Sequence, residues 1–216
     1  MNADKYSSLA ALKEHVGEDG YRIRAVNRFA PVTVIAPHGG YIEPGTSLIA
    51  HRVAGQNWNL FDFQGLQREN GLDLHITATN FRDPTLSKML RASAAAVSIH
   101  GMFAQGTKDV WLGGLNTELK AHLERELVRA GFSVNANSPR YRGESPRNVV
   151  NMPPLHGAQL ELSDELLADL FGTANRFLSS GRAPRTTSRL TAFIAAIRRA
   201  ISKYVRGLRD RSEDVA

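Results

Sequence analysis

Residues 32–47 read Val-Thr-Val-Ile-Ala-Pro-His-Gly-Gly-Tyr-Ile-Glu-Pro-Gly-Thr-Ser, and this stretch indicates the fold class. Its first part, Val32–Ala36, is a β-branched, apolar run of the kind found in buried strands. The run ends in a glycine-rich loop that carries His38 and, five positions later, Glu43. α/β proteins commonly place functional side chains in the loops that follow buried strands. The stretch therefore predicts an α/β fold with a metal or catalytic site at the carboxyl end of this strand.

The segments around this stretch alternate between strand-like and helix-like patterns. Alternating or continuous apolar residues predict strands at residues 21–26, 32–36, 58–63, 72–78, 95–99, 109–112, 132–135 and 157–162. Apolar residues at helical spacing predict helices at residues 6–16, 44–54, 84–94 and 116–130, and from Ser163 to about residue 178. Residues 136–154 contain several prolines and no periodicity, so we expect a long functional loop there. Strands that alternate with helices are typical of an α/β sandwich with a mainly parallel sheet.

The length and composition are those of an ordinary folded domain. The chain has 216 residues, of which 42% are hydrophobic and 22% charged, enough for one domain with a substantial core. It contains no cysteine, so a zinc ion would have to be held by histidine, aspartate or glutamate. The N-terminal sequence has no basic start followed by an apolar segment, and no apolar run is long enough to span a membrane. We therefore expect a cytoplasmic location.

Basic residues are concentrated in the C-terminal part of the chain. The net charge is +6, and residues 172–216 hold ten Lys or Arg and three Asp or Glu, which leaves a net charge of −1 for residues 1–171. We expect three parts: an α/β domain at residues 1–178, a polar linker at 179–188, and a basic amphipathic helix with its tail at 189–216. The helix could bind nucleic acid or an anionic membrane through residues 189–211. It could equally pack its apolar side on the domain or on another subunit.

Two predicted strands end in a histidine. His38 follows the first buried strand, and His100 follows the strand predicted at residues 95–99. Together with Glu43 they make up two imidazoles and one carboxylate, which is the protein part of a catalytic zinc site. Such a site leaves one position for water and lowers the pKa of that water towards about 7. The alternative is that both are hydrogen-bonded loop histidines without a metal.

Glu161 lies on a strand that otherwise looks buried. In the segment Gly157–Ser163, Gln159 and Glu161 share one side, and the apolar residues share the other. A carboxylate in this position could be a general base that takes a proton from water and later gives it to a leaving amine. The alternative is an edge strand on which Glu161 faces solvent.

Arginines near the predicted site could bind an anionic group. Arg82 lies just past the strand predicted at residues 72–78, and the long loop contains three more: Arg140, Arg142 and Arg147. A guanidinium can bind a carboxylate through two parallel hydrogen bonds or stabilise a developing oxyanion, although most arginines simply lie on the surface. We expect Arg82 and Arg147 to contact the substrate.

Four further histidines give weaker signals. His51 and His122 lie on predicted helices and His75 lies within a predicted strand, so we interpret these three as structural. His156 lies in a loop near Glu161 and is less persuasive as a functional residue than His38 or His100.

Four segments of the chain resemble the poly-γ-glutamate hydrolase family. They are Ala36–Ser47, Phe61–Gly65, Val97–Gly101 and Gly157–Ser163, and they follow the order of the family over about residues 20–180. The family contains phage and bacterial proteins, and its fold is similar to that of zinc carboxypeptidases and aspartoacylase-type deacylases. The resemblance implies a three-layer α/β sandwich with a mixed, mainly parallel sheet. It also adds release from the cell or association with a phage to the possible locations.

The same resemblance implies an activity. By resemblance, zinc would be bound by His38, Glu43 and His100, and Glu161 would be the general base. The reaction would be hydrolysis of an amide that links glutamates through the side-chain carboxylate. Its substrate would be an anionic glutamyl polymer or an acyl-amino acid. The alternative is a non-enzymatic protein that binds nucleic acid or an anionic membrane through residues 189–211.

Two positions depart from the family pattern. Leu48 stands where an acidic residue is frequent, and Met152 stands where an arginine is common. The departures concern the residues that hold the substrate and leave the three metal ligands in place.

Overall fold

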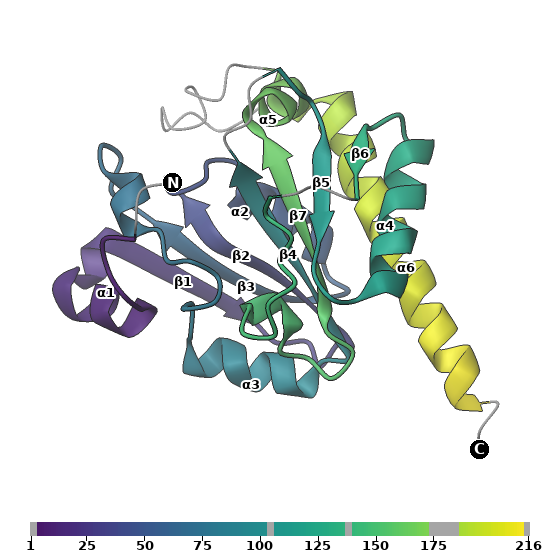
Figure 1. Cartoon of the computed structure of the whole chain (residues 1–216), viewed down its shortest axis with the longest axis horizontal. Coiled ribbons are helices and arrows are strands. Elements are labelled where there is room, and N and C mark those ends of the chain that lie inside the picture. Colours follow the sequence, from purple (N-terminus) through teal and green to yellow (C-terminus); the bar gives the residue numbers. More distant parts are fainter. Residues whose placement is uncertain (1–3, 103–105, 137–139, 173–185, 214–216) are drawn as a thin grey trace.

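A mixed β-sheet runs through the middle of the structure (Figure 1). The computed structural model describes residues 4–102, 106–136, 140–172 and 186–213. The strands are β1 Tyr21–Val26, β2 Val32–Gly40, β3 Asn59–Gly65, β4 Ala95–Met102, β5 Val110–Gly113, β6 Val134–Asn135 and β7 Gly157–Ser163. Their order is β1-β3-β2-β4-β7-β5-β6, with β1 antiparallel to β3, β5 antiparallel to β7, and every other neighbouring pair parallel. The predicted mixed, mainly parallel sheet is confirmed.

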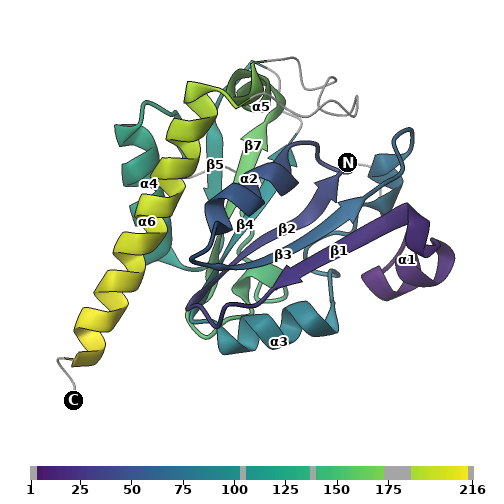
Figure 2. The ribbon, with the colours of Figure 1, turned by 180° about the vertical axis from the view of Figure 1, so that it is seen from behind.

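Helices cover both faces of this sheet, so the molecule has three layers. The helices are α1 Leu9–His15, α2 Thr46–Ala54, α3 Pro84–Ala92, α4 Thr117–Arg129, α5 Asp164–Phe171 and α6 Ser188–Glu213. One apolar core lies between the sheet and helices α2, α4, α5 and α6, and a second lies between the opposite face and helices α1 and α3. Seen from behind, α2 and α6 lie across the sheet (Figure 2). The α/β sandwich is therefore confirmed as three-layered.

The basic C-terminal helix is part of the main core. On α6 the predicted apolar stripe is buried, with Leu190, Phe193 and Ile197 fully inaccessible to solvent. Most of this apolar face is therefore covered by the domain, and among the described residues no helix is long and apolar enough to cross a membrane. The structure thus supports the packed alternative over a free membrane-binding helix. Most of the predicted linker, residues 179–185, lies outside the described residues.

Several basic side chains of α6 are bound to the rest of the domain. Arg199 Nε and Lys203 Nζ donate to Glu126 of α4, a carboxylate with no solvent exposure, at 3.1 and 2.7 Å. Arg211 forms two hydrogen bonds to Glu118, also on α4. Because these charges are paired within the domain, they give no support to a nucleic-acid surface on this helix.

The strand predicted at Leu72–Ala78 is wrong. The structure has a 3-10 helix at Gly71–Leu74, followed by an irregular segment that pairs with no strand. Leu74 and Ile76 are buried, as the strand-like alternation predicts, but Leu72, which alternation places on the same side, is 72% exposed. The carbonyl of Ile76 accepts a hydrogen bond from a histidine side chain instead of a strand neighbour. The alternating pattern predicted the burial of Leu74 and Ile76, but neither the exposure of Leu72 nor the hydrogen bonds of this segment.

Candidate functional site

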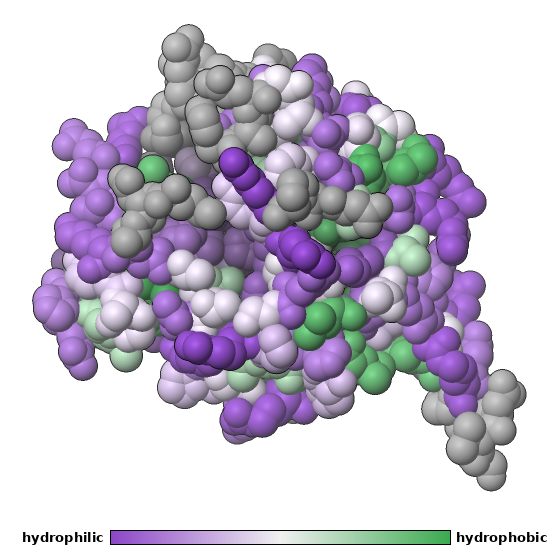
Figure 3. All heavy atoms as spheres, viewed as in Figure 1, coloured by the Kyte–Doolittle hydropathy of each residue, from purple (hydrophilic) through white to green (hydrophobic). Residues whose placement is uncertain are grey.

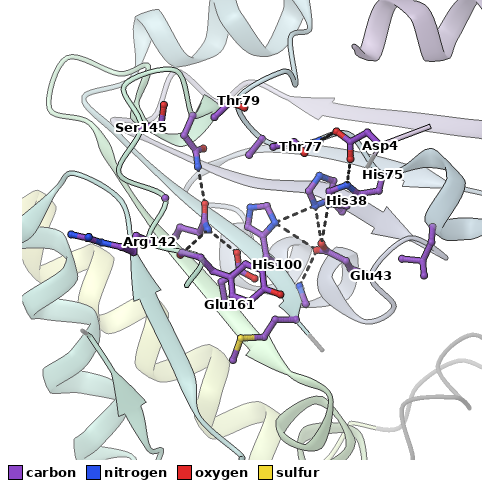
Figure 4. Close-up of a pocket in the computed structure, with 18 of the residues that line it drawn as sticks. Asp4, His38, Glu43, His75, Thr77, Thr79, His100, Arg142, Ser145 and Glu161 are labelled. Carbon is purple, nitrogen blue, oxygen red and sulfur yellow. Dashed lines mark hydrogen bonds and ion pairs between the residues drawn. The ribbon is translucent and has the colours of Figure 1, made fainter. Parts of the chain in front are cut away.

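The carboxyl ends of β2, β4 and β7 lie side by side because these strands are parallel neighbours. His38 lies near the end of β2, His100 on β4, and Glu161 on β7, where the register pairs it directly with His100. Glu43 lies in the loop between β2 and α2. Its backbone N–H donates to the His38 carbonyl at 2.9 Å, which turns the loop back over the strand end. The four predicted residues are thus brought together (Figure 4).

Three potential ligand atoms converge at this edge of the sheet. His38 Nδ1 lies 2.8 Å from Glu43 Oε1 and 3.2 Å from His100 Nδ1. His100 Nδ1 in turn lies 3.6 Å from Glu43 Oε2, which also accepts a hydrogen bond from the Gly101 N–H at 2.9 Å. His38 and His100 are only 2% and 3% exposed. The three side chains therefore enclose one position that is shielded from bulk water.

This arrangement could hold a divalent metal ion. Ligand atoms at the roughly 2.0–2.1 Å distance of zinc are about 3.3 Å apart in a tetrahedron, and the three separations lie on both sides of that value. His38 Nε2 lies 2.8 Å from the Ile76 carbonyl, so the proton belongs on Nε2 and the Nδ1 lone pair faces the cluster. Burial raises the pKa of Glu43, but the interactions of its carboxylate with the neighbouring imidazoles of His38 and His100 outweigh that effect. The pKa of Glu43 is held below its ordinary value, which keeps the carboxylate ionised.

Glu161 is the second buried carboxyl group of the site. It is 4% exposed, and its Oε1 accepts a hydrogen bond of 2.6 Å from Gln159 Nε2. Burial raises the pKa of Glu161 to about 8, against the positive charge of His100 and with the negative charge of Glu43. A cation bound beside Glu161 would favour its ionised form. A carboxyl group with such a pKa can exchange a proton near neutral pH.

His75 also belongs to the site, and the sequence interpretation missed it. Its ring lies against that of His38, with centroids 4.1 Å apart, and its Nε2 is 4.0 Å from Glu43 Oε1. Asp4 Oδ1 lies 2.7 Å from His75 Nδ1 and fixes the ring. His38, Glu43 and His75 therefore form an alternative group of three potential metal ligands. No sequence signal marked it, because the residues around it alternate in the manner of a strand.

The two arginines expected to bind substrate lie outside the pocket that contains these residues. Arg82 donates to the carbonyls of Phe81 and Arg147 and not into the site. Among the residues that line the pocket, the long loop instead contributes Arg142, whose guanidinium pairs with Glu144 at 2.6 Å. The sequence indicated that an arginine-bearing loop lies at the pocket, but it could not determine which arginine lines the cavity, and the guanidinium of Arg142 points away from the cluster (Figure 4).

The pocket is a cavity of about 940 Å³ that opens beside the cluster. Besides the residues already described, its wall includes Lys5 and Tyr141. Tyr141 has a φ of 54°, a conformation that bulky residues rarely adopt and that often marks functional loops. Hydrophilic residues predominate on this face of the molecule (Figure 3). The cavity is large enough for several residues of a polar substrate.

A model of the poly-gamma-glutamate hydrolase family matches residues 6–196. The chain belongs to the poly-γ-glutamate hydrolase family. This confirms the resemblance seen in the four sequence segments and identifies the protein as a hydrolase. The match extends beyond residue 180 into α6, further than the sequence segments indicated. The inclusion of this helix agrees with its buried position in the core.

Individual relatives cover nearly the whole chain. The SPbeta prophage-derived UPF0714 protein YoqZ of Bacillus subtilis (strain 168) is 32% identical over 208 residues, 95% of this chain and 74% of YoqZ. The structure of a bacteriophage poly-γ-glutamate hydrolase has a TM-score of 0.89 at 30% identity, over 95% of this chain and 100% of that one. A zinc-free apo structure of YndL has a TM-score of 0.84 at 29% identity, over 93% and 98%. The poly-γ-glutamate hydrolase fold is therefore shared along the whole domain.

Proposed function

We propose that this protein is a zinc-dependent amidohydrolase that cleaves γ-glutamyl amide bonds, in poly-γ-glutamate or in a related glutamyl or N-acyl substrate. The observation that carries the proposal is the convergence of His38 Nδ1, Glu43 and His100 Nδ1 at near-tetrahedral separations beside Glu161. Family membership supports the substrate class, and the zinc-free apo form of the related YndL supports zinc as the metal. His38, Glu43 and His100 would be the ligands.

The side chains divide the chemistry between them. Zinc, when bound, supplies a Lewis acid for the scissile carbonyl and lowers the pKa of water towards about 7. Glu161 takes the proton from the attacking water and gives it to the leaving amine nitrogen, so that each amide hydrolysed leaves one carboxylate and one amine. Gln159 holds the Glu161 carboxyl in place through the bond to Oε1. His38 is kept in its ligand tautomer by the Ile76 carbonyl.

The polymer would be held by the loop that carries Arg142. Each residue of poly-γ-glutamate has a free carboxylate, and Arg142 is the loop arginine among the residues that line the pocket, with its guanidinium directed away from His38 and Glu161 in the unbound structure (Figure 4). To bind the substrate, Arg142 must turn toward the cluster and exchange its ion pair with Glu144 for one with a substrate carboxylate, which is feasible because its side chain is 63% exposed. We therefore assign the clamp to Arg142 in place of Arg82 and Arg147.

The proposal predicts that hydrolysis requires metal. Protein stripped with a chelator should release no amine from poly-γ-glutamate, and one equivalent of zinc should restore activity, because the attacking water is activated only at the metal. New amino groups and polymer length would be followed after zinc addition. N-acyl glutamates tested in parallel would define the substrate class. Full activity of metal-free protein would refute the zinc mechanism, and inactivity of zinc-loaded protein on all these amides would refute the proposed substrates.

A second prediction separates the two possible metal-binding groups. His75→Ala should retain about one zinc per chain, because His75 Nε2 is 4.0 Å from Glu43 and its other nitrogen is bound to Asp4. Bound zinc would be measured by metal analysis after gel filtration. If His75→Ala loses zinc while His100→Ala keeps it, the ligands are instead His38, Glu43 and His75.

A further inference from the structure

Regular alternation along β2 would place His38 on one face of the sheet, but its side chain lies on the other face. Within β2, Val34 and Ala36 face the core under α2, and Ile35 faces the core under α3. Counting on in steps of two, His38 should follow Ala36 to the α2 side. Its ring instead lies near Phe81, with centroids 6.3 Å apart, in the layer of α3. Something between Ala36 and His38 reverses the alternation.

The reversal is a β-bulge in β2. Ala36 pairs with Asp62 of β3, but Gly39 pairs with Gln64, so three steps along β2 match two steps along β3. One extra residue in a strand exchanges the sides of all that follow it. The bulge therefore decides that His38 faces His100 and the pocket. Without it, the imidazole would lie beneath α2.

Side chains on the α2 side hold this bulge. The Gly40 N–H donates to Ser47 Oγ at 3.0 Å, and Ser47 Oγ donates to Asp62 Oδ1 at 2.8 Å. Gly39 lies directly against these two side chains, and a Cβ there would overlap Ser47 Oγ and Asp62 Oδ1. The bulge, the first turn of α2 and β3 are thus joined through one carboxylate. We call Ser47 and Asp62 the bulge lock.

Burying the carboxylate of Asp62 costs free energy, and both of its oxygens are hydrogen-bonded in the structure. It has no solvent exposure, and besides Ser47 it accepts hydrogen bonds from His51 Nε2 at 2.7 Å and Gln64 Nε2 at 2.5 Å. Arg24 lies 3.3 Å from His51 Nδ1, so the His51 proton belongs on Nε2, pointing at Asp62. A fully buried carboxylate is costly unless all its oxygens are bonded. An apolar residue would fill this space at less cost, so the carboxylate has a specific role.

We propose that Asp62 and Ser47 are positioning residues that hold His38 on the metal-binding side of the sheet. They touch neither metal nor substrate, because they lie on the opposite face and act through the Gly39–Gly40 bulge. This inference rests on the proposed zinc site, because Asp62 and Ser47 would act by holding one zinc ligand, His38, in position. Residues that orient metal ligands typically change affinity by about 10–100-fold when replaced.

The test is the zinc affinity of lock variants, measured by competition with a chromophoric chelator. Asp62→Asn and Ser47→Ala should each bind zinc about 10–100-fold more weakly than the wild type. An amide can no longer accept all three hydrogen bonds of Asp62, and alanine leaves the Gly40 N–H without an acceptor. Ser47→Thr keeps the hydroxyl and should restore most of the affinity. If Asp62→Asn fails to fold, the comparison of zinc affinity between Ser47→Ala and Ser47→Thr tests the proposal.

Glu126→Gln is the matched control. Glu126 is likewise a carboxylate without solvent exposure, bound to Arg199 and Lys203, but it lies between α4 and α6. The Glu126→Gln substitution should lower the melting temperature and leave the zinc affinity at the wild-type value. Zinc affinity equal to the wild type in the folded lock variants would overturn the proposal.

A readout without metal separates this inference from the proposed function. If the wild type binds no zinc, the proposed function fails. The positioning role of the bulge lock is then tested by amide hydrogen exchange in the metal-free proteins. The Glu43 N–H, which donates to the His38 carbonyl, should exchange at least tenfold faster in Ser47→Ala than in the wild type. Equal exchange rates would overturn the proposal.

Discussion

Replacing Glu161 with glutamine should lower kcat on poly-γ-glutamate by about 10²–10⁴-fold while leaving zinc content near one per chain. Glutamine has almost the same shape, and its carbonyl can still accept the hydrogen bond from Gln159. It cannot take up a proton at neutral pH, so the attacking water and the leaving amine lose their proton carrier. Zinc content and kcat, measured on the same preparation, separate this effect from loss of the metal.

The control for this variant is another carboxyl group at the pocket. Asp73 lines the cavity, but its 44% exposed side chain pairs with Lys5 at 2.6 Å and not with the proposed zinc ligands. Asp73→Asn should keep kcat within about tenfold of the wild type. A Glu161→Gln protein with wild-type kcat would show that proton transfer does not pass through Glu161.

Replacing His100 with alanine should abolish zinc binding and activity together. Two ligands would remain, and the loss should exceed the roughly 10–100-fold that replacement of a supporting residue costs. Zinc stabilises the folded protein in proportion to its binding, by about 2.7 kcal/mol when zinc is at 100 times its Kd. The melting temperature of the wild type should therefore rise on addition of zinc, and that of His100→Ala should not.

His122→Ala is the corresponding control. His122 lies on α4, with its ring 6.4 Å from that of Tyr204, in the layer of α6 and away from the pocket. Its removal should leave the zinc-dependent rise in melting temperature unchanged. A His100→Ala protein that still binds one zinc with wild-type affinity would contradict the assignment of His100 as a ligand.

The sequence was most informative where local pattern and chemistry coincide. Buried strands ending in His38 and His100, and a carboxylate facing away from the apolar side of β7, were all visible as residue patterns. In a parallel sheet the carboxyl ends of neighbouring strands share one edge, so these patterns alone predicted that the residues could meet. The helix over residues 188–213 was similarly evident from its apolar stripe.

The sequence was less informative where a role depends on distant contacts. His75 looked like a strand residue because its neighbours alternate in burial, yet it lies beside His38 and is held by Asp4, 71 positions away. Arg82 and Arg147 had the right charge, but backbone carbonyls and loop geometry, rather than composition, decide which arginine lines the pocket. Neither outcome could be predicted from spacing.

The sequence by itself determined the donor chemistry: without cysteine, a site of histidines and carboxylates at strand ends, on an α/β chain of the poly-γ-glutamate hydrolase family. Only the tertiary structure decided that α6 closes the core and that His38 faces the pocket. The first depends on apolar contacts with α4 and the sheet. The second depends on a one-residue bulge bound to Ser47 and Asp62. Local sequence determines which side chains a strand can offer, whereas pairing with distant strands determines the side of the sheet on which they lie.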